Sequence, residues 1–253
     1  KRGRTLPRRS LRWWAVAFWV IVWQIAAMCL GQEILLVSPA SVLVRLWELT
    51  PHWDFWSAVL FSFSRITLGF LLACAAGTLL AVLSSRFFLI RDLAAPLMTT
   101  VKSIPVASFI ILVLIWVPSR NLSVVISFLM VTPILYQNVL GGISSMDRDL
   151  TEMADVFGVS YPRRLRYLYL PQVMPFFRSA CAVSLGLCWK AGVAAEVIGL
   201  PKGSIGERLY EAKVYLETPS LFAWTVVIIL VSLLFEKLFL FLLDRAVSRL
   251  ERG

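Results

Sequence analysis

This chain of 253 residues has almost no histidine and no closely spaced pair of cysteines. The single histidine is His52, and the four cysteines, Cys29, Cys74, Cys181 and Cys188, form no C-x-x-C pair. Structural metal sites and disulfide frameworks need Cys and His at short, defined spacings, so the sequence predicts neither. The lack of a His/Asp constellation also argues against a membrane-embedded protease or lipid-modifying transferase. We expect four free thiols in the core, all within apolar segments.

Charged residues are also scarce, at 16% of the chain, whereas 59% of residues are hydrophobic and the mean hydropathy is +0.79. A soluble domain needs a more polar surface than this. The net charge of +10 would suit a nucleic-acid-binding protein, but no Lys/Arg stripe with interleaved aromatic residues lies outside the apolar runs. We therefore predict an all-α integral membrane protein, with the lipid bilayer as a partner and no nucleic acid.

Apolar runs of roughly twenty residues, enough for a helix to cross a bilayer, recur six times. The predicted spans are residues 13–31, 55–83, 93–117, 122–143, 173–195 and 221–243. The first run has no small-x-small cleavage site, so we expect a retained span and not a signal peptide. The predicted organisation is a cytoplasmic segment at residues 1–12 followed by one transmembrane domain at residues 13–253.

The distribution of Lys and Arg predicts the orientation of these spans. With both termini in the cytoplasm, 15 Lys and Arg fall in cytoplasmic segments and 5 in external segments. Because loops rich in Lys and Arg stay on the cytoplasmic side, we predict a multi-pass protein with both termini in the cytoplasm.

Three prolines interrupt the middle spans: Pro96 and Pro105 in the third, and Pro133 in the fourth. Each removes a backbone donor and tends to kink its helix, which a membrane tolerates where other protein or a water-filled cavity satisfies the backbone. We expect the third and fourth spans to line the interior, with a simple kink as the alternative.

Four ionisable residues within or at the edges of the spans are candidates for a solute pathway. They are Arg65, Lys102, Lys190 and Glu196. A charge exposed to lipid costs roughly 3 kcal/mol on insertion scales, so these side chains should face the protein interior or a cavity. The three cations would suit an anionic or zwitterionic solute. Two alternatives stay open: Arg65 can snorkel or pair with Asp92 or Glu196, and Glu196 can guard the external mouth of the fifth span.

The longest cytoplasmic loop, residues 144–171, is too polar to enter lipid. One short helix is predicted from an apolar repeat at i, i+3, i+4 and i+7, formed by Leu150, Met153, Ala154 and Phe157. Gly158 follows as its C-terminal stop. Ser160 and Pro162 suit the start of a second helix, whose arginines can meet an acidic partner or lipid phosphates.

This loop resembles the cytoplasmic signature of the permeases of bacterial binding-protein-dependent ABC importers. The signature is Glu-Ala-Ala, three residues, Gly, nine residues and Ile-x-Leu-Pro. Here residues 152–154 (Glu-Met-Ala) are followed by Gly158 and by residues 168–171 (Leu-Tyr-Leu-Pro) at that spacing, with conservative changes at Met153 and Leu168. The match spans twenty residues and is much more specific than a lone glycine motif.

Further stretches resemble the nitrate/sulfonate/taurine-type branch of these permeases. They are residues 37–40 (Val-Ser-Pro-Ala), 65–70 (Arg-Ile-Thr-Leu-Gly-Phe), 102–105 (Lys-Ser-Ile-Pro) and 195–199 (Ala-Glu-Val-Ile-Gly). Residues 118–120 (Pro-Ser-Arg) replace the Gly-containing turn of the branch, which leaves the substrate open. Aliphatic sulfonates, nitrate and vitamin precursors are the candidates.

The resemblance implies a type I ABC importer-like permease fold, in which the loop is a coupling helix seated in a groove of a separate ATPase. The residues implied in this coupling are Glu152, Met153, Ala154, Phe157, Gly158, Leu170 and Pro171. Glu152 would fix the loop through hydrogen bonds or an Arg partner. The chain has no G-x-x-x-x-G-K-[ST] sequence, so we expect ATP and Mg to bind the partner ATPase and this chain to hold no cofactor.

The same resemblance implies a homodimer or a close paralogue as second half, an extracytoplasmic solute-binding protein, and a location in the bacterial inner membrane. A secondary transporter or channel is the alternative. It would need paired acidic residues, inverted repeats or a filter, none of which the sequence presents.

Overall fold

The computed structural model describes residues 13–32 and 35–252, and every regular element within these residues is helical. The elements are α1 (Trp13–Leu30), α2 (Pro39–Leu49), α3 (Trp53–Arg86), α4 (Phe88–Ser103), α5 (Val106–Leu114), α6 (Ser119–Ser144), α7 (Arg148–Val156), α8 (Tyr161–Arg164), a π-helical turn (Leu165–Tyr169), α9 (Leu170–Gly199), α10 (Ile205–Val214) and α11 (Thr218–Arg252). The predicted segment 1–12 lies outside the described residues.

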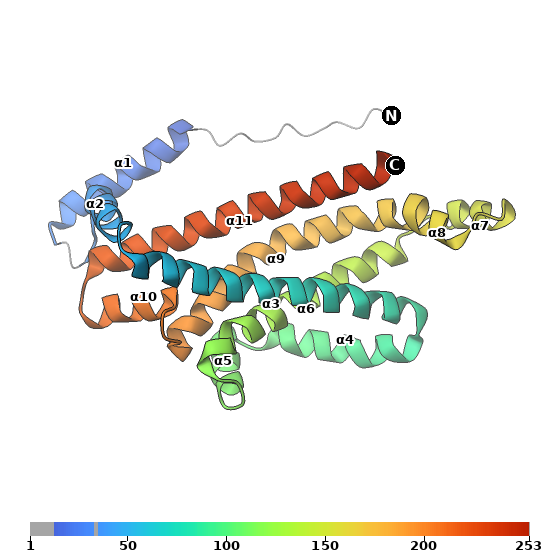
Figure 1. Ribbon diagram of the computed structural model, residues 1–253, viewed down its shortest axis with the longest axis horizontal. Helices are drawn as coiled ribbons and strands as arrows, with labels where there is room; N and C mark the ends of the chain where they lie inside the picture. Colours follow the sequence, from blue (N-terminus) through green and yellow to red (C-terminus); the bar gives the residue numbers. More distant parts are fainter. Residues whose placement is uncertain (1–12, 33–34, 253) are drawn as a thin grey trace.

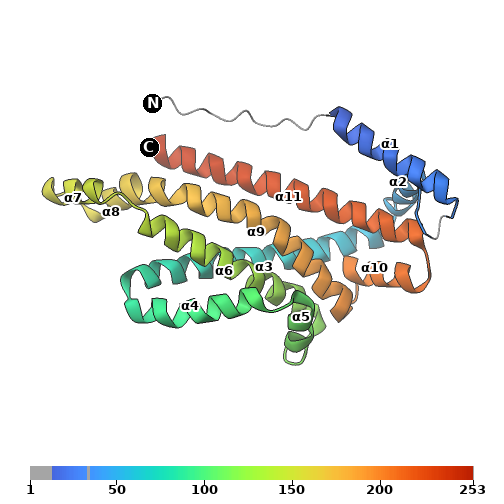
Figure 2. The same ribbon diagram turned by 180° about the vertical axis from the view of Figure 1, so that it is seen from behind.

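The long helices lie side by side along the longest axis of the molecule, as Figures 1 and 2 show. Helix α6 lies between α3 and α9, on which it packs most extensively. Helices α2 and α10 lie at one end of the bundle, and α7 and α8 lie at the other, toward which the C-terminal end of α11 also points (Figure 1). The loop that contains α7 and α8 is therefore separated from α10 by the length of the bundle.

Four of the predicted spans are long apolar helices: α3, α6, α11, and α9 with its preceding turns from Tyr161. The predicted first span corresponds to α1, a shorter apolar helix. The predicted third span, residues 93–117, corresponds to α4 and α5, which pass together as one apolar span but are bent by 106° at the break between them. Pro105 lacks a backbone donor and favours an extended conformation at the preceding residue, and Ile104 has φ −76° and ψ 130°.

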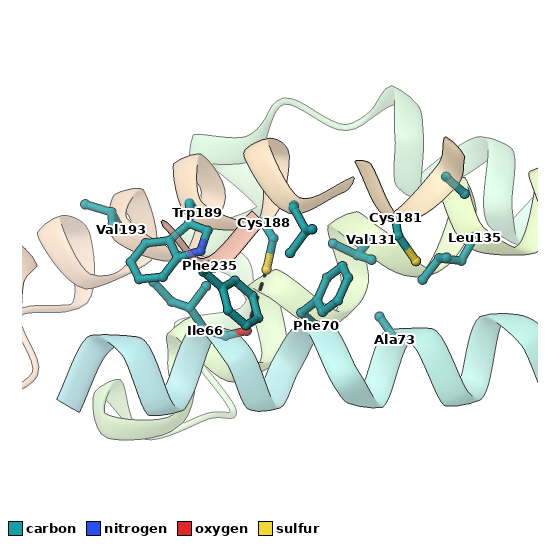
Figure 3. Close-up of a cluster of buried hydrophobic side chains, with 12 residues drawn as sticks. Ile66, Phe70, Ala73, Val131, Leu135, Cys181, Cys188, Trp189, Val193 and Phe235 are labelled. Carbon is teal, nitrogen blue, oxygen red and sulfur yellow. Dashed lines mark hydrogen bonds between the residues drawn. The ribbon is translucent and has the colours of Figure 1, made fainter. Parts of the chain in front are cut away.

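Side chains of α3, α6, α9 and α11 form the main core, shown in Figure 3. Phe70, Trp189 and Phe235 bring aromatic rings together there, and Phe70 and Phe235 lie edge to face with centroids 6.1 Å apart. Close approach of α3 to α6 depends on Gly69. A Cβ atom at this position would lie 2.8 Å from Ser127 Cβ and closer still to the carbonyl oxygen of Val124. Such small residues allow membrane helices to pack backbone against backbone.

All four cysteines are free, as predicted. Cys181 and Cys188 lie in the core, and the Cys188 thiol donates to the carbonyl oxygen of Ile66 at 3.6 Å (Figure 3). Cys29 is exposed on α1, so its expected place in the core was wrong. Helix α1 lies at the edge of the bundle (Figure 1), and most of its large apolar side chains are exposed.

Two sides of the bundle differ in polarity. Helix α11 exposes a row of large apolar side chains, including Leu230, Leu234 and Leu238, which suits a lipid-facing wall. Helix α4 lies at another edge and buries only Ala94 and Met98. Its exposed residues include several polar ones near its C-terminal end: Thr99, Thr100, Lys102 and Ser103. The α4 part of the third predicted span thus lies at the edge of the single chain, whereas α5 buries Phe109, Ile110 and Val113 against α6 and α9. Helix α6, the fourth span, lies in the interior.

Candidate functional site

Helix α7 begins at a well-formed cap. The Asp147 carboxylate accepts a hydrogen bond from the backbone N–H of Asp149 at 3.0 Å, and the Asp147 N–H donates to the side-chain oxygen of Gln172 at 2.9 Å. Carboxylates at a helix start satisfy free N–H groups and interact favourably with the helix dipole. The bond to Gln172 also ties the start of α7 to the first turn of α9.

Helix α7 ends at the predicted glycine. Gly158 has φ +61°, a left-handed conformation that favours glycine, and the chain then reverses so that the Val159 N–H donates to the carbonyl oxygen of Ala154 at 3.0 Å. The loop is therefore a helix, a tight turn and a return helix, in agreement with the predicted helix and stop.

The side chain of one arginine, Arg164, binds the backbone of this turn. Arg164 donates from Nε to the carbonyl oxygen of Val159 at 2.6 Å and from Nη2 to that of Ala154 at 3.1 Å, and its Nη1 pairs with Asp155. The expectation that Glu152 fixes the loop was wrong: it is exposed and makes no hydrogen bond or ion pair with any described residue. Arg164 lies one turn into the return helix, from where its planar fork reaches two carbonyl groups at once.

The outward surface of the loop is apolar. Val156 and Phe157 are 84% and 77% exposed, with Met153 and Leu150 beside them, and we name these four residues the hook patch. Ala154 is only 5% exposed and packs inward, so it does not belong to the patch. The sequence pattern missed Val156 because the helix ends at that residue and the chain then departs from the helical spacing used to predict one face.

The second loop helix is not a separate element. Helix α8, the π-helical turn and α9 form one continuous helix from Tyr161 to Gly199. Leu170 and Pro171, predicted in the coupling set, lie half-buried in the first turn of α9. Pro171 is tolerated near the start of that helix, and the π-helical turn precedes it. The return helix of the loop thus continues directly into a membrane span.

The candidate pathway cations are not gathered into one cluster. Arg65 on α3 donates to the side-chain oxygen of Asn121, near the start of α6, and not to Asp92 or Glu196. Lys102 on α4 is exposed and donates to Gln137 Oε1 at 2.7 Å. Asn121 and Gln137 are separated on α6 by about 24 Å of helix rise. These two cations therefore lie at different depths and cannot bind one small solute together.

The other two pathway candidates differ from each other in burial. Lys190 is exposed on α9 and has no hydrogen bond or ion pair with another described residue. Glu196, near the end of α9, is fully buried and accepts a hydrogen bond from the Ser62 hydroxyl at 2.6 Å. A groove of about 330 Å³ between α3, α4 and α6 is apolar on nearly all sides. The polar positions that could meet a solute are thus on the outside of the single chain.

Comparison with known proteins places these features in a family. Residues 66–252 match the family described as the binding-protein-dependent transport system inner membrane component. The chain is 24% identical over 220 residues to the taurine transport system permease protein TauC of Escherichia coli, covering 85% of this chain and 80% of that protein. It is 26% identical over 203 residues to the nitrate import permease protein NrtB of Synechococcus elongatus, covering 76% and 72%.

A solved structure shares the fold. The crystal structure of an amino acid ABC transporter with histidines has a TM-score of 0.58 at 17% identity, covering 81% of this chain and 97% of that one. The fold is that of a type I permease. Because the family match covers most of the length, including the hook patch and Arg164, this chain belongs to the family of inner membrane components of binding-protein-dependent transport systems.

Proposed function

We propose that this chain is the translocation subunit of an ABC importer, and that it carries a small anionic or zwitterionic solute, such as a sulfonate, nitrate or a vitamin precursor, across a bacterial inner membrane. The observation that carries the proposal is the hook patch. Its apolar side chains project from a short, polar helix at one end of the bundle (Figure 1), where a groove on another protein can cover them. That partner is a separate ATPase, which binds ATP and Mg in place of this chain.

The charges of the outward polar positions support the solute class. Lys102 and Lys190 are exposed cations on helices that otherwise meet lipid or protein, and Arg65 is a third, half-buried cation. Cations without matching acids at membrane depth favour an anion or a zwitterion. Taurine and nitrate, the solutes named for two relatives, have this chemistry.

A second copy of the chain covers the elbow, which is the bend between α4 and α5 at residues 104–105. The elbow lies about 24 Å along α4 from its start, which is within a hydrocarbon core about 30 Å thick. Non-helical backbone at this depth is tolerated only against protein or water, yet Ser103 and Pro105 are exposed in the single chain. A homodimer whose two-fold axis runs beside α4 would cover both elbows and leave a water-filled pathway between them, with Lys102 on its wall.

The positions of α7, α2 and α10 also give the proposed orientation of the chain in the membrane. With α7 on the ATPase side, the C-terminal end of α11 is cytoplasmic, and α2 and α10 lie on the outer surface, where an extracytoplasmic solute-binding protein delivers the solute. The excess of Lys and Arg in the segments assigned to the inside supports this placement.

Co-purification with the ATPase of the same transporter tests the proposal. A charge in the hook patch, Phe157→Asp, should abolish recovery of the ATPase with the permease in detergent, while the permease still inserts into the membrane. Trp47→Asp is the matched control, because Trp47 is an equally exposed aromatic residue (80%) on α2, at the opposite end. Undiminished ATPase recovery with Phe157→Asp would refute the assigned role of the patch.

Energy dependence separates the proposal from the secondary-transporter alternative. Uptake into proteoliposomes should require ATP on the α7 side and persist when proton and sodium gradients are collapsed. Uptake that follows an ion gradient and ignores ATP would favour the alternative.

A further inference from the structure

Glu196 is the most completely buried carboxylate of the described residues, and it lies at the end of α9 farthest from the hook patch. Its Oε2 accepts a hydrogen bond from the Ser62 hydroxyl on α3 at 2.6 Å. The same oxygen lies 3.4 Å from the backbone nitrogen of Gly206, which donates to it from the first turn of α10. One carboxyl group thus contacts three elements: its own helix α9, α3 and α10.

Ser62 extends this contact to a second amide of α10. Its hydroxyl oxygen accepts from the backbone N–H of Ile205 at 3.0 Å. The first N–H groups of a helix have no partner within the helix, and here two of them are satisfied by α3 and α9. The N–H of the third residue, Glu207, is capped locally, since it donates to the Ser204 hydroxyl oxygen at 3.0 Å.

Helix α10 also lies directly against the backbone of α9. A Cβ atom at Gly206 would lie 2.5 Å from the backbone nitrogen of Val197 and closer still to Glu196 Cβ, so only glycine allows this approach. Both Ile205 and Gly206 are buried. The start of α10 is therefore fastened to α9 by shape as well as by hydrogen bonds.

The clasping oxygen is Oε2, since the second oxygen, Oε1, is buried without a hydrogen-bond partner among the described residues. Burying a polar atom in this way costs stability. The junction of three helices therefore keeps Glu196 buried at a cost, while its other oxygen accepts two hydrogen bonds from α3 and α10.

The helix that bears Glu196 reaches the other end of the molecule as one helical segment, with a π-helical turn and Pro175 within it. It runs over 39 residues from Tyr161 to Gly199, which corresponds to about 58 Å of rise. Arg164 binds the α7 turn at one end of this helix, and Glu196 binds α10 at the other.

Building on the proposed function, we propose that Glu196 is a positioning residue that clasps α10 to the far end of α9, so that α10 moves with α9 when the ATPase displaces α7. This clasp consists of Glu196, Ser62 and the backbone amides of Ile205 and Gly206. Helix α10 is then the external element that follows the nucleotide state, and loss of the clasp uncouples it while leaving α7 in place.

Hydrogen–deuterium exchange on the intact permease–ATPase complex in lipid nanodiscs tests the clasp. Peptides covering α7 and α10 are compared between ADP and ATP with vanadate. In the wild type, both peptides should change their exchange between the two states. In Glu196→Ala and Ser62→Ala, the α7 change should remain and the α10 change should be lost. Glu196→Gln keeps an acceptor oxygen for Ser62 and Gly206 and should restore the α10 change.

Glu207→Ala is the matched control. Glu207 lies at the same helix start, but its carboxylate accepts from the N–H of Gly203 at 2.6 Å, a contact within the α10 segment. This variant should keep both changes. A folded Glu196→Ala complex with an intact α10 response would overturn the clasp, and so would a wild-type complex in which α7 responds and α10 does not. If Glu196→Ala does not fold, Ser62→Ala decides by the same criterion. An α7 that ignores nucleotide in the wild type would instead refute the proposed function, and the clasp with it.

Discussion

Arg164 donates to the carbonyl oxygen of Ala154 at 3.1 Å, across the turn that ends α7. The two residues are ten positions apart, and the bond joins the α7 helix to the helix that continues into the membrane. Because Arg164 is mostly buried and its guanidinium also binds Val159 and Asp155, the turn is held in one geometry. A rigid turn can transmit a displacement of α7 to α9, whereas a mobile turn would absorb it.

The first prediction concerns this arginine. Arg164→Ala should raise the amide exchange of α7 by roughly 10- to 100-fold, because losing a charge-assisted hydrogen bond costs about 1.5–3 kcal/mol locally. Arg164→Lys should be intermediate, since an ammonium group cannot present the planar fork. Exchange of the α7 peptide, followed by mass spectrometry, measures the effect. Arg163→Ala, at an exposed neighbouring arginine, is the control, and equal effects of the two alanine variants would contradict the assigned role.

The second prediction concerns the left-handed turn residue. Gly158→Ala should strain the turn by about 1–2 kcal/mol, because a Cβ atom disfavours φ near +61°. Gly158→Asn should be better tolerated, since asparagine adopts this conformation more readily. The rate of chymotrypsin cleavage after the exposed Phe157 reports on loosening of the turn. Gly141→Ala has open space at the end of α6 and should leave the rate unchanged; an identical acceleration would count against the turn-specific effect.

The third prediction concerns helix packing. Gly69→Ala should destabilise the protein by about 1–3 kcal/mol, because the added methyl group meets the α6 backbone at Val124. Gly186→Ala meets nothing within 4 Å and should be neutral or slightly stabilising, since alanine is the better helix former. Thermal unfolding in detergent, followed by tryptophan fluorescence, compares the two. The same melting temperature for both variants would show that α3 and α6 do not approach as described.

The fourth prediction concerns the polar edge of α4. In a background without the four native cysteines, Lys102→Cys should react with a charged, membrane-impermeant thiosulfonate, because the proposed pathway is filled with water. Leu234→Cys on the apolar wall of α11 should be inert, since a lipid-facing thiol is not ionised to its reactive form. The modified fraction is measured by mass spectrometry. An unreactive cysteine at position 102 would place this edge against lipid or closely packed protein.

Much of the fold follows from local chemistry that a sequence displays. The apolar lengths predict α3, α6, α9 and α11, because a helix that satisfies its own backbone is the available solution in lipid. The helix and stop at residues 148–158 follow from short-range rules: a carboxylate at the start, an apolar repeat and a glycine that allows a left-handed turn.

The predictions that failed depended on contacts between distant segments. Pro105 predicted a disturbance, but not a bend of 106°, because the angle depends on what α4 and α5 pack against. Glu152 belongs to the family signature, yet Arg164 and Asp155 hold the turn, since the return path of the chain brings the guanidinium to the carbonyl groups.

The sequence alone determined that this protein spans a membrane, which residues form its long helices and where the helix–turn–helix loop of residues 144–171 lies, because hydrophobic length and turn chemistry are local properties. Only the tertiary structure decided which loop side chains face outward, that Arg65 and Lys102 lie at different depths, and that Glu196 joins α9, α3 and α10. These outcomes depend on how helices far apart in the chain pack together, and the same residue types in another packing would give other neighbours.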